Sequence, residues 1–176
     1  FFQTYWQSVL EQNVIRVPQG CPYLEKAMAL AVVFSEKKEY TKADPLKIVL
    51  EKGVHEIVGD DDGCMHVTCS HITFVGKGKG KDQTTIRGGF QVENQQNVKF
   101  EELVVTNPSG DGFYLDGGET NVDVLKCAVK ECGDTGMWVG GGATVTATQC
   151  EFMENVIQGV YCDGANTTAR LDDCTM

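Results

Sequence analysis

The chain has 176 residues, which fits one domain with a substantial core, and 41% of its residues are hydrophobic. A formal net charge of −10 would repel a phosphate backbone, so the composition argues against a nucleic-acid partner. No apolar run is long enough to span a bilayer, which argues against an integral membrane protein.

The first 44 residues are expected to form a helical cap with a first strand, and residues 45–176 to form the repeats of the same single domain. The spacing of apolar residues, prolines and charges indicates four segments before the repeats. They are a short amphipathic helix at Phe1–Leu10, a strand at Val14–Val17, a helix at Pro22–Phe34 and a charged linker at Glu36–Asp44. Pro22 suits the first helical position, where a missing N–H is tolerated.

Irregular strands are expected next, as the first coils of the repeat region. They are Lys47–Leu50, Gly53–His55, His71–Gly76 and Thr85–Gly89. Asp60–Asp62 is expected to be an exposed loop, with a calcium site as the alternative. The Gly-Lys alternation over residues 76–81 lacks the Gly-Lys-Ser/Thr order of a phosphate-binding loop, so a flexible turn is expected.

Two cysteines and two histidines interleave at Cys64, His66, Cys69 and His71. Their spacing does not match an established zinc motif, although a zinc site remains the alternative interpretation. The sequence therefore predicts no metal ligand and no cofactor.

Internal repeats provide the strongest signal. Three segments align, Asn97–Thr120, Asn121–Ala143 and Thr144–Asn166, and a fourth begins at Thr167 and stops at Met176. The aligned columns are Val98/Val122/Val145, Leu103/Cys127/Cys150/Cys174, Val105/Val129/Phe152/Met176, Gly112/Gly136/Gly159, Phe113/Met137/Val160 and Leu115/Val139/Cys162. Repetition at this period indicates stacked units that share one core.

Apolar residues alternate with polar ones inside each unit, as in Val122-Asp123-Val124, which is typical of strands. A leucine-rich repeat of similar length would need Leu at fixed positions, and Leu is scarce in these columns. The predicted fold is therefore all-β, a right-handed parallel β-helix of about five to six coils with an N-terminal helical cap.

The segments IVLEKGVHEIVG and ITFVGKGKGKDQTTIRGG resemble the opening coils of the pectin-lyase-like superfamily, most of all its carbohydrate-binding and sugar-hydrolase repeat branch. The resemblance covers Arg16 to Met176. It implies a β-helix whose first strand and helix cover the bottom of the stack. It does not imply one activity, because the superfamily includes lyases, hydrolases, epimerases and proteins that are not enzymes.

The enzymes of that superfamily use clustered Asp with an Arg or Lys base, or two to three Asp at close range. The regular coils contain one Arg, Arg170, and the Asp-rich hydrolase motifs are absent. Asp111, Asp116, Asp134 and Asp163 lie beside Gly in turns, where Asp is locally favoured. No catalytic residue is predicted.

One column carries aromatic residues: Tyr114, Trp138 and Tyr161. Alternation places them outward, between inward residues on either side. They can stabilise the sheet by stacking on one another, or they can form a platform for a sugar ring or a protein partner. We predict them as ligand-binding or partner-binding residues, together with Asp116 and Asp163.

The column of Cys127, Cys150 and Cys174 is expected to point inward as free thiols, because stacked coils lie about 4.8 Å apart, wider than the usual Cβ separation of a disulfide. Reduced cysteines favour an intracellular setting, whereas the glycosylation sequon at Asn166–Thr168 points the other way.

The fourth repeat stops in mid-coil, with Arg170 expected in the column of Phe100, Val124 and Ala147. The top of the core would be bare, so we expect cover from more chain, a partner subunit or a second copy. The preferred function is a non-catalytic recognition or scaffold module for a polysaccharide or protein partner, within a larger chain or complex. The alternatives are a polysaccharide lyase, epimerase or hydrolase, and a structural subunit.

Overall fold

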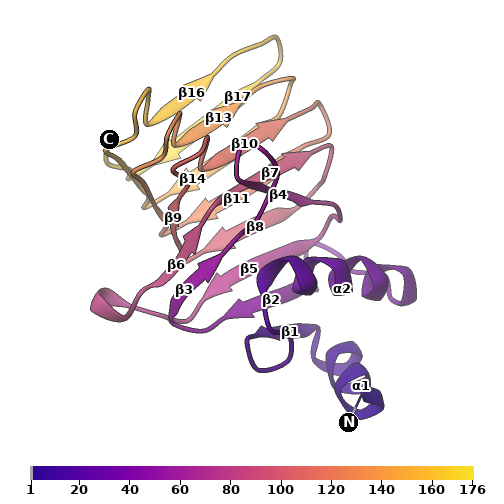
Figure 1. Ribbon diagram of the computed structural model, residues 1–176. Helices are drawn as coiled ribbons and strands as arrows, with labels where there is room; N and C mark the ends of the chain where they lie inside the picture. The colour runs from indigo at the N-terminus through magenta and orange to yellow at the C-terminus, as the bar shows by residue number, and fades with distance from the viewer. Residues whose placement is uncertain (1) are drawn as a thin grey trace.

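The computed structural model describes residues 2–176, except for the side chains of Phe2 and Lys81. Its strands form three parallel sheets, here called sheets A, B and C, which extend along one stack of coils (Figure 1). The predicted parallel β-helix is confirmed: five coils each place one strand in every sheet, and two further strands extend sheet A at its ends.

The strands of each sheet follow the order of the coils. Sheet A contains β1 (Val14–Val17), β2 (Leu46–Leu50), β5 (Ile72–Gly76), β8 (Val98–Glu101), β11 (Asn121–Leu125), β14 (Thr144–Thr148) and β17 (Thr168–Asp172). Sheet B contains β3 (Gly53–Glu56), β6 (Thr84–Arg87), β9 (Val104–Thr106), β12 (Ala128–Lys130) and β15 (Glu151–Met153). Sheet C contains β4 (Cys64–Val67), β7 (Gly89–Glu93), β10 (Phe113–Asp116), β13 (Met137–Val139) and β16 (Val160–Cys162).

Two helices lie at the N-terminal end of the stack, α1 (Phe2–Gln12) and α2 (Leu24–Lys37) (Figure 1). Helix α2 buries one face against the core, made of Leu24, Ala27, Met28, Ala31 and Phe34. The ring of Trp6 on α1 lies 4.5 Å from that of Phe34. The helical cap is confirmed, because these side chains cover the open end of the first coil. Neither described helix is long and apolar enough to cross a membrane.

The start of α2 differs from the prediction. Pro22 does not occupy the first helical position, because Tyr23 is extended at φ −151° and ψ 165° and precedes the helix. The helix begins at Leu24, which is fully buried. At its other end α2 continues to Lys37, so the expected linker at Glu36–Asp44 starts inside the helix.

Phenylalanine rings fill the middle coils. Phe74, Phe90, Phe100 and Phe113 come from sheets A and C and are fully buried. Phe100 lies 5.0 Å from Phe74, 4.7 Å from Phe90 and 4.8 Å from Phe113, measured between ring centroids. The two inward faces therefore interlock through aromatic side chains rather than meeting as smooth surfaces.

The register of the last repeat corrects one prediction. Arg170 pairs with Thr146 and points outward, and Leu171 occupies the column of Phe100, Val124 and Ala147. The fourth repeat starts at Thr168 rather than Thr167, because the turn between β16 and β17 contains one residue more than the preceding turn between sheets C and A. The apolar column continues to the last strand.

The predicted inward cysteine column is present. Cys127 and Cys150 are buried, and Cys174 at the end of the stack is half-buried. Their thiols donate to carbonyl oxygens of the coil below, over 3.7 Å from Cys127 to Phe100 and 3.4 Å from Cys150 to Val124. The cysteine thiols therefore donate hydrogen bonds to backbone carbonyl oxygens of the neighbouring coil, at the corner where each coil leaves sheet A.

Iodoacetamide is expected to label Cys162 in the native protein and to spare Cys127 and Cys150. Cys162 is exposed, whereas burial shields the other two thiols and raises their pKa, to about 11 for Cys150. Mass spectrometry after native labelling, and again after unfolding without reductant, measures both states. Labelling of Cys127, Cys150 and Cys174 only after reduction would reveal a disulfide and contradict the prediction of free thiols.

Apolar side chains of the last coil are less covered than those of earlier coils. Leu115 and Val139 are fully buried, whereas Cys162 in the same column is exposed. Met176 is 73% exposed. That more chain, a partner or a second copy covers this end stays a prediction.

Candidate functional site

The predicted aromatic column lies on the outer face of sheet C. Tyr114 pairs in register with Trp138, and Trp138 pairs with Tyr161 on the next strand. The inward neighbours Phe113 and Met137 are fully buried, so the alternation predicted for this sheet is confirmed.

The rings of Tyr114 and Trp138 stack face to face. Their centroids lie 4.5 Å apart and their planes differ by 4°. The stack therefore stands on the sheet, with ring edges toward solvent, and one face of Trp138 is covered by Tyr114. The other face of Trp138 looks toward the strand of Tyr161. Two of the three aromatic residues therefore stack on one another, which was one of the two alternatives for this column, and the assignment of the column to binding stays a prediction.

A glycine fixes the orientation of the indole. Gly140 lies two residues after Trp138 on the same outer face, and a Cβ built at Gly140 would overlap the indole ring. Trp138 consequently lies along its own strand over a position without a side chain. The sequence Trp-Val-Gly provides both the ring and the space that the ring needs.

The two predicted aspartates lie at the ends of sheet C strands. Asp116 closes β10, and its half-buried carboxylate lies next to the backbone of Gly141. Asp163 follows β16, where Oδ1 accepts the N–H of Gly164 over 2.7 Å and Oδ2 lies 3.4 Å from the hydroxyl of Tyr161. Tyr161 is 38% exposed. The aromatic column and both aspartates therefore share one face.

A polar cavity of about 370 Å³ adjoins the aromatic pair, at the edge where chains enter sheet C. Its lining residues come from four coils: Asp62, Cys64, Gln91, Ser109, Gly110, Asp111, Tyr114 and Asp134. Asp111 and Asp134 are predicted from the sequence as turn residues, and no sequence pattern indicates the cavity. Both do lie in loops, and there they bring carboxylates together beside Tyr114.

Asn107 holds the walls of this cavity together. Its buried side chain donates from Nδ2 to the carbonyl oxygens of Asp62 and Asp111, over 2.8 and 2.7 Å. Its Oδ1 accepts the N–H of Ser109 over 3.2 Å. One amide thus links a loop of the first coil to a loop of the third, and it fixes the backbone that carries two of the carboxylates.

The carboxylates act on one another and on Tyr114. Burial, and then the charges of Asp134 and Asp62, raise the pKa of Asp111, although its carboxylate accepts the N–H of Thr135 over 2.8 Å. Burial and the charges of Asp116, Asp111 and Glu93 raise the pKa of the Tyr114 hydroxyl. Negative potential therefore accumulates at the cavity.

Asp111→Asn is expected to raise the melting temperature at neutral pH and to have no such effect below about pH 4. The folded-state pKa of Asp111 lies above the unfolded value, so its ionisation destabilises the native protein once the pH exceeds the folded pKa. Below the unfolded pKa both states hold the proton and the difference disappears. Asn keeps an oxygen that can accept from Thr135. Melting curves at both pH values check this, with Asp123→Asn on sheet A as the control. A lower melting temperature for Asp111→Asn at pH 7 would contradict it.

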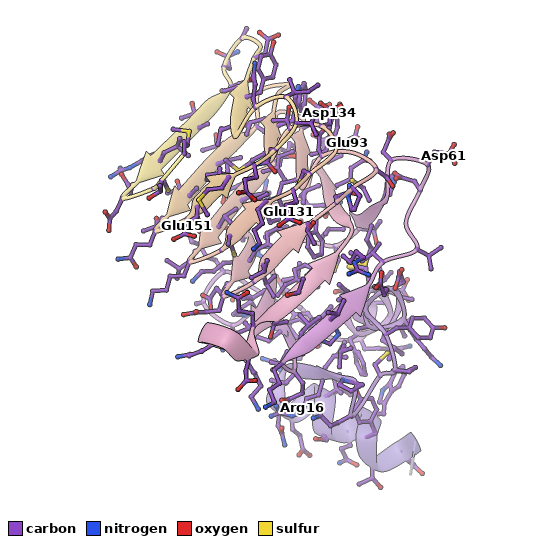
Figure 2. All side chains as sticks on the ribbon, turned by 60° about the vertical axis from the view of Figure 1, so that its left-hand side comes forward. Arg16, Asp61, Glu93, Glu131, Asp134 and Glu151 are labelled. Atoms are coloured by element: carbon purple, nitrogen blue, oxygen red, sulfur yellow. The ribbon has the colours of Figure 1, made fainter. Side chains whose placement is uncertain are left out.

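The acidic loop before β4 is held by its own hydrogen bonds. Asp60 Oδ1 accepts the N–H of Cys64 over 2.9 Å, and Oδ2 lies 2.9 Å from Nε2 of His66. Although burial opposes the shift, these bonds hold the pKa of Asp60 below its usual value. Asp61 lies at the tip of the loop (Figure 2). Within the described residues, no group of three or more His, Cys, Asp and Glu is arranged to hold a metal ion.

A protein-family model described as "Right handed beta helix region" matches residues 56–176. No curated protein and no solved structure matches the chain. The matched segment contains sheet C from β4 to β16, and with it the aromatic column, both predicted aspartates and the cavity.

Proposed function

The chain belongs to the right-handed beta helix family, and from that premise we propose that it is a non-catalytic recognition module whose binding surface is the outer face of sheet C. The observation that carries the proposal is the stacked pair of Tyr114 and Trp138 beside a polar cavity. Aromatic residues that are held rigidly and remain accessible are typical anchors of binding sites.

The orientation of the pair supports binding over simple sheet stabilisation. Stacking uses one face of Trp138, while the other face and the ring edges are not covered by Tyr114. Carboxylates at Asp116 and Asp163 and the amide of Gln91 provide hydrogen-bond acceptors around the rings. A sugar ring or a protein side chain can use both kinds of contact.

Tryptophan fluorescence provides the test. The chain has two tryptophans, so Trp6→Phe leaves Trp138 as the one indole reporter. Defined ligands, namely neutral oligosaccharides, oligogalacturonate, and basic and acidic peptides, are titrated into this variant of the full chain. At least one is expected to change the Trp138 signal and to bind about tenfold more weakly to Trp138→Ala, since an interface anchor contributes about 1–2 kcal/mol or more.

Two variants make the result specific. Gly140→Ala keeps the indole but forces it from its position, so it should weaken binding in the same direction as Trp138→Ala. Tyr23→Ala removes a ring that is 54% exposed near the cap and should leave binding unchanged. Cleavage of oligogalacturonate would favour the enzyme alternative. A stable protein complex that forms equally well without Trp138 would favour the structural-subunit alternative.

A further inference from the structure

Charged residues are divided unequally between the faces of the β-helix. Sheet C and its flanking loops contain eleven Asp and Glu and neither Lys nor Arg, over residues 57–71, 88–97, 107–120, 131–143 and 154–167. Residues 45–176 contain ten Lys and Arg, and all of them lie on sheets A and B or on the turns that follow the strands of sheet A. The same sheets and turns contain nine Asp and Glu, so their charges nearly cancel. The net charge of the chain is therefore concentrated on the face that carries the aromatic pair.

Six of the nine acidic residues on the other faces have a Lys or Arg partner within 4.0 Å. Lys77 lies 3.1 Å from Glu51, Arg87 lies 2.9 Å from Glu56, and Arg170 lies 2.7 Å from Asp172. Of the eleven acidic residues on sheet C and its loops, two have a basic partner among the described side chains, Asp60 with His66 and Glu131 with Lys130. Among the ion pairs of the described residues, none involves Asp62, Glu93, Asp111, Asp116, Asp134 or Asp163.

This negative surface extends along the coils. Figure 2 shows Asp134, Glu93 and Asp61 toward one side of the solenoid and Glu151, on sheet B, toward the other. The carboxylates of Asp111, Asp134 and Asp62 meet at the cavity, and their mutual repulsion is one reason for the raised pKa of Asp111. A bound cation would relieve that repulsion.

The aromatic pair favours one kind of cation. A guanidinium group is planar, carries five donors and stacks on an indole face better than an ammonium group does. Trp138 has one face not covered by Tyr114, and this face looks toward the strand of Tyr161, beside which Asp163 carries a carboxylate that can accept from a guanidinium. The cavity volume of about 370 Å³ has room for one such side chain.

We propose that the outer face of sheet C is the docking surface for a basic, arginine-rich segment of a protein partner. The inference rests on the proposed function and names the partner class for the same surface. Phosphate backbones and uronate polymers would be repelled by this face. A neutral glycan can use the carboxylates only as hydrogen-bond acceptors, whereas a basic peptide also neutralises their charge and stacks on the rings.

Fluorescence anisotropy with the full chain tests this, using a fluorescein-labelled peptide of Arg-Gly-Ser repeats. The peptide is expected to bind at about 50 mM NaCl and to bind several-fold more weakly at about 200 mM, because exposed charges are screened. The double variant Asp111→Asn/Asp134→Asn should weaken binding about tenfold. A peptide with Lys in place of Arg should bind more weakly than the Arg peptide.

The matched control removes two acidic charges from other faces, through Asp123→Asn on sheet A and Glu151→Gln on sheet B. It should change the affinity by less than about twofold. Equal weakening by both double variants would mean attraction to net charge alone and would overturn the inference. No binding of the Arg peptide would also overturn it. Binding of a neutral oligosaccharide that depends on Trp138 would then leave the proposed function standing.

Discussion

Replacing Phe100 with Ala is expected to lower the free energy of unfolding by about 3–5 kcal/mol. Phe100 is fully buried on β8 in the third coil, and its ring is in contact distance of three other phenylalanine rings from sheets A and C. Removing the ring leaves a cavity that neighbouring coils cannot fill, because hydrogen bonds to the strands on both sides fix the spacing of β8.

Urea unfolding followed by circular dichroism measures the change as a shift of the midpoint. Tyr23→Ala is the control, because it removes an aromatic ring that is 54% exposed and should cost less than about 1 kcal/mol. A Phe100→Ala protein within about 1 kcal/mol of wild type would mean that the phenylalanine cluster does not hold the coils together.

The regular coils could be predicted from sequence because every column is repeated. Over residues 97–166 the inward positions recur at nearly equal spacing, so a single alignment determines the register of three sheets. Tyr114, Trp138 and Tyr161 follow from that register alone. The one error, at Arg170, arose because a turn at the surface can gain a residue without any change in the core. Loop length is set by the exposed side of the solenoid, where insertion is tolerated.

The first coils were predicted less well. Strands β4 and β7 were missed because the repeat alignment starts at Asn97, although Met65 and Phe90 extend the inward column of Phe113 into the first two coils. The cavity was missed for a different reason. Its walls belong to Asp62, Gln91, Asp111 and Asp134, which lie in separate coils and come together only when those coils stack. The division of charge between the faces, by contrast, was visible in the sequence once each residue could be assigned to a sheet.

Asn107 shows how the stacking places the site. It follows β9 as an ordinary polar residue in a Pro-Ser-Gly loop, and no motif marks it. In the structure it is 1% exposed, and its amide N–H groups are aimed at two carbonyl oxygens from different coils. This position requires a side chain with two N–H donors and one acceptor oxygen. Among small residues, Asn meets this requirement.

Asn107→Asp is accordingly expected to destabilise the protein by about 3–5 kcal/mol at pH 7, although the two side chains have the same shape. A carboxylate oxygen would replace the amide nitrogen and face the carbonyl oxygens of Asp62 and Asp111 with no proton between them. Asn107→Ala should cost less, about 1–3 kcal/mol, because it leaves the carbonyl groups unpaired but buries no charge. Asn166→Asp makes the same chemical change at an exposed position and should have little effect.

The pH dependence separates the charge from the lost hydrogen bonds. A carboxyl group buried against carbonyl oxygens has a folded-state pKa above its unfolded value. The penalty of Asn107→Asp should therefore be largest above the folded pKa and should shrink toward that of Asn107→Ala below about pH 4, where both states are protonated. A protonated carboxyl group can also donate to one of the two carbonyl oxygens. Chemical unfolding at pH 7 and pH 4 measures both limits. A penalty for Asn107→Asp that is equal at the two pH values would mean that this position is open to water and that Asn107 does not hold the cavity walls.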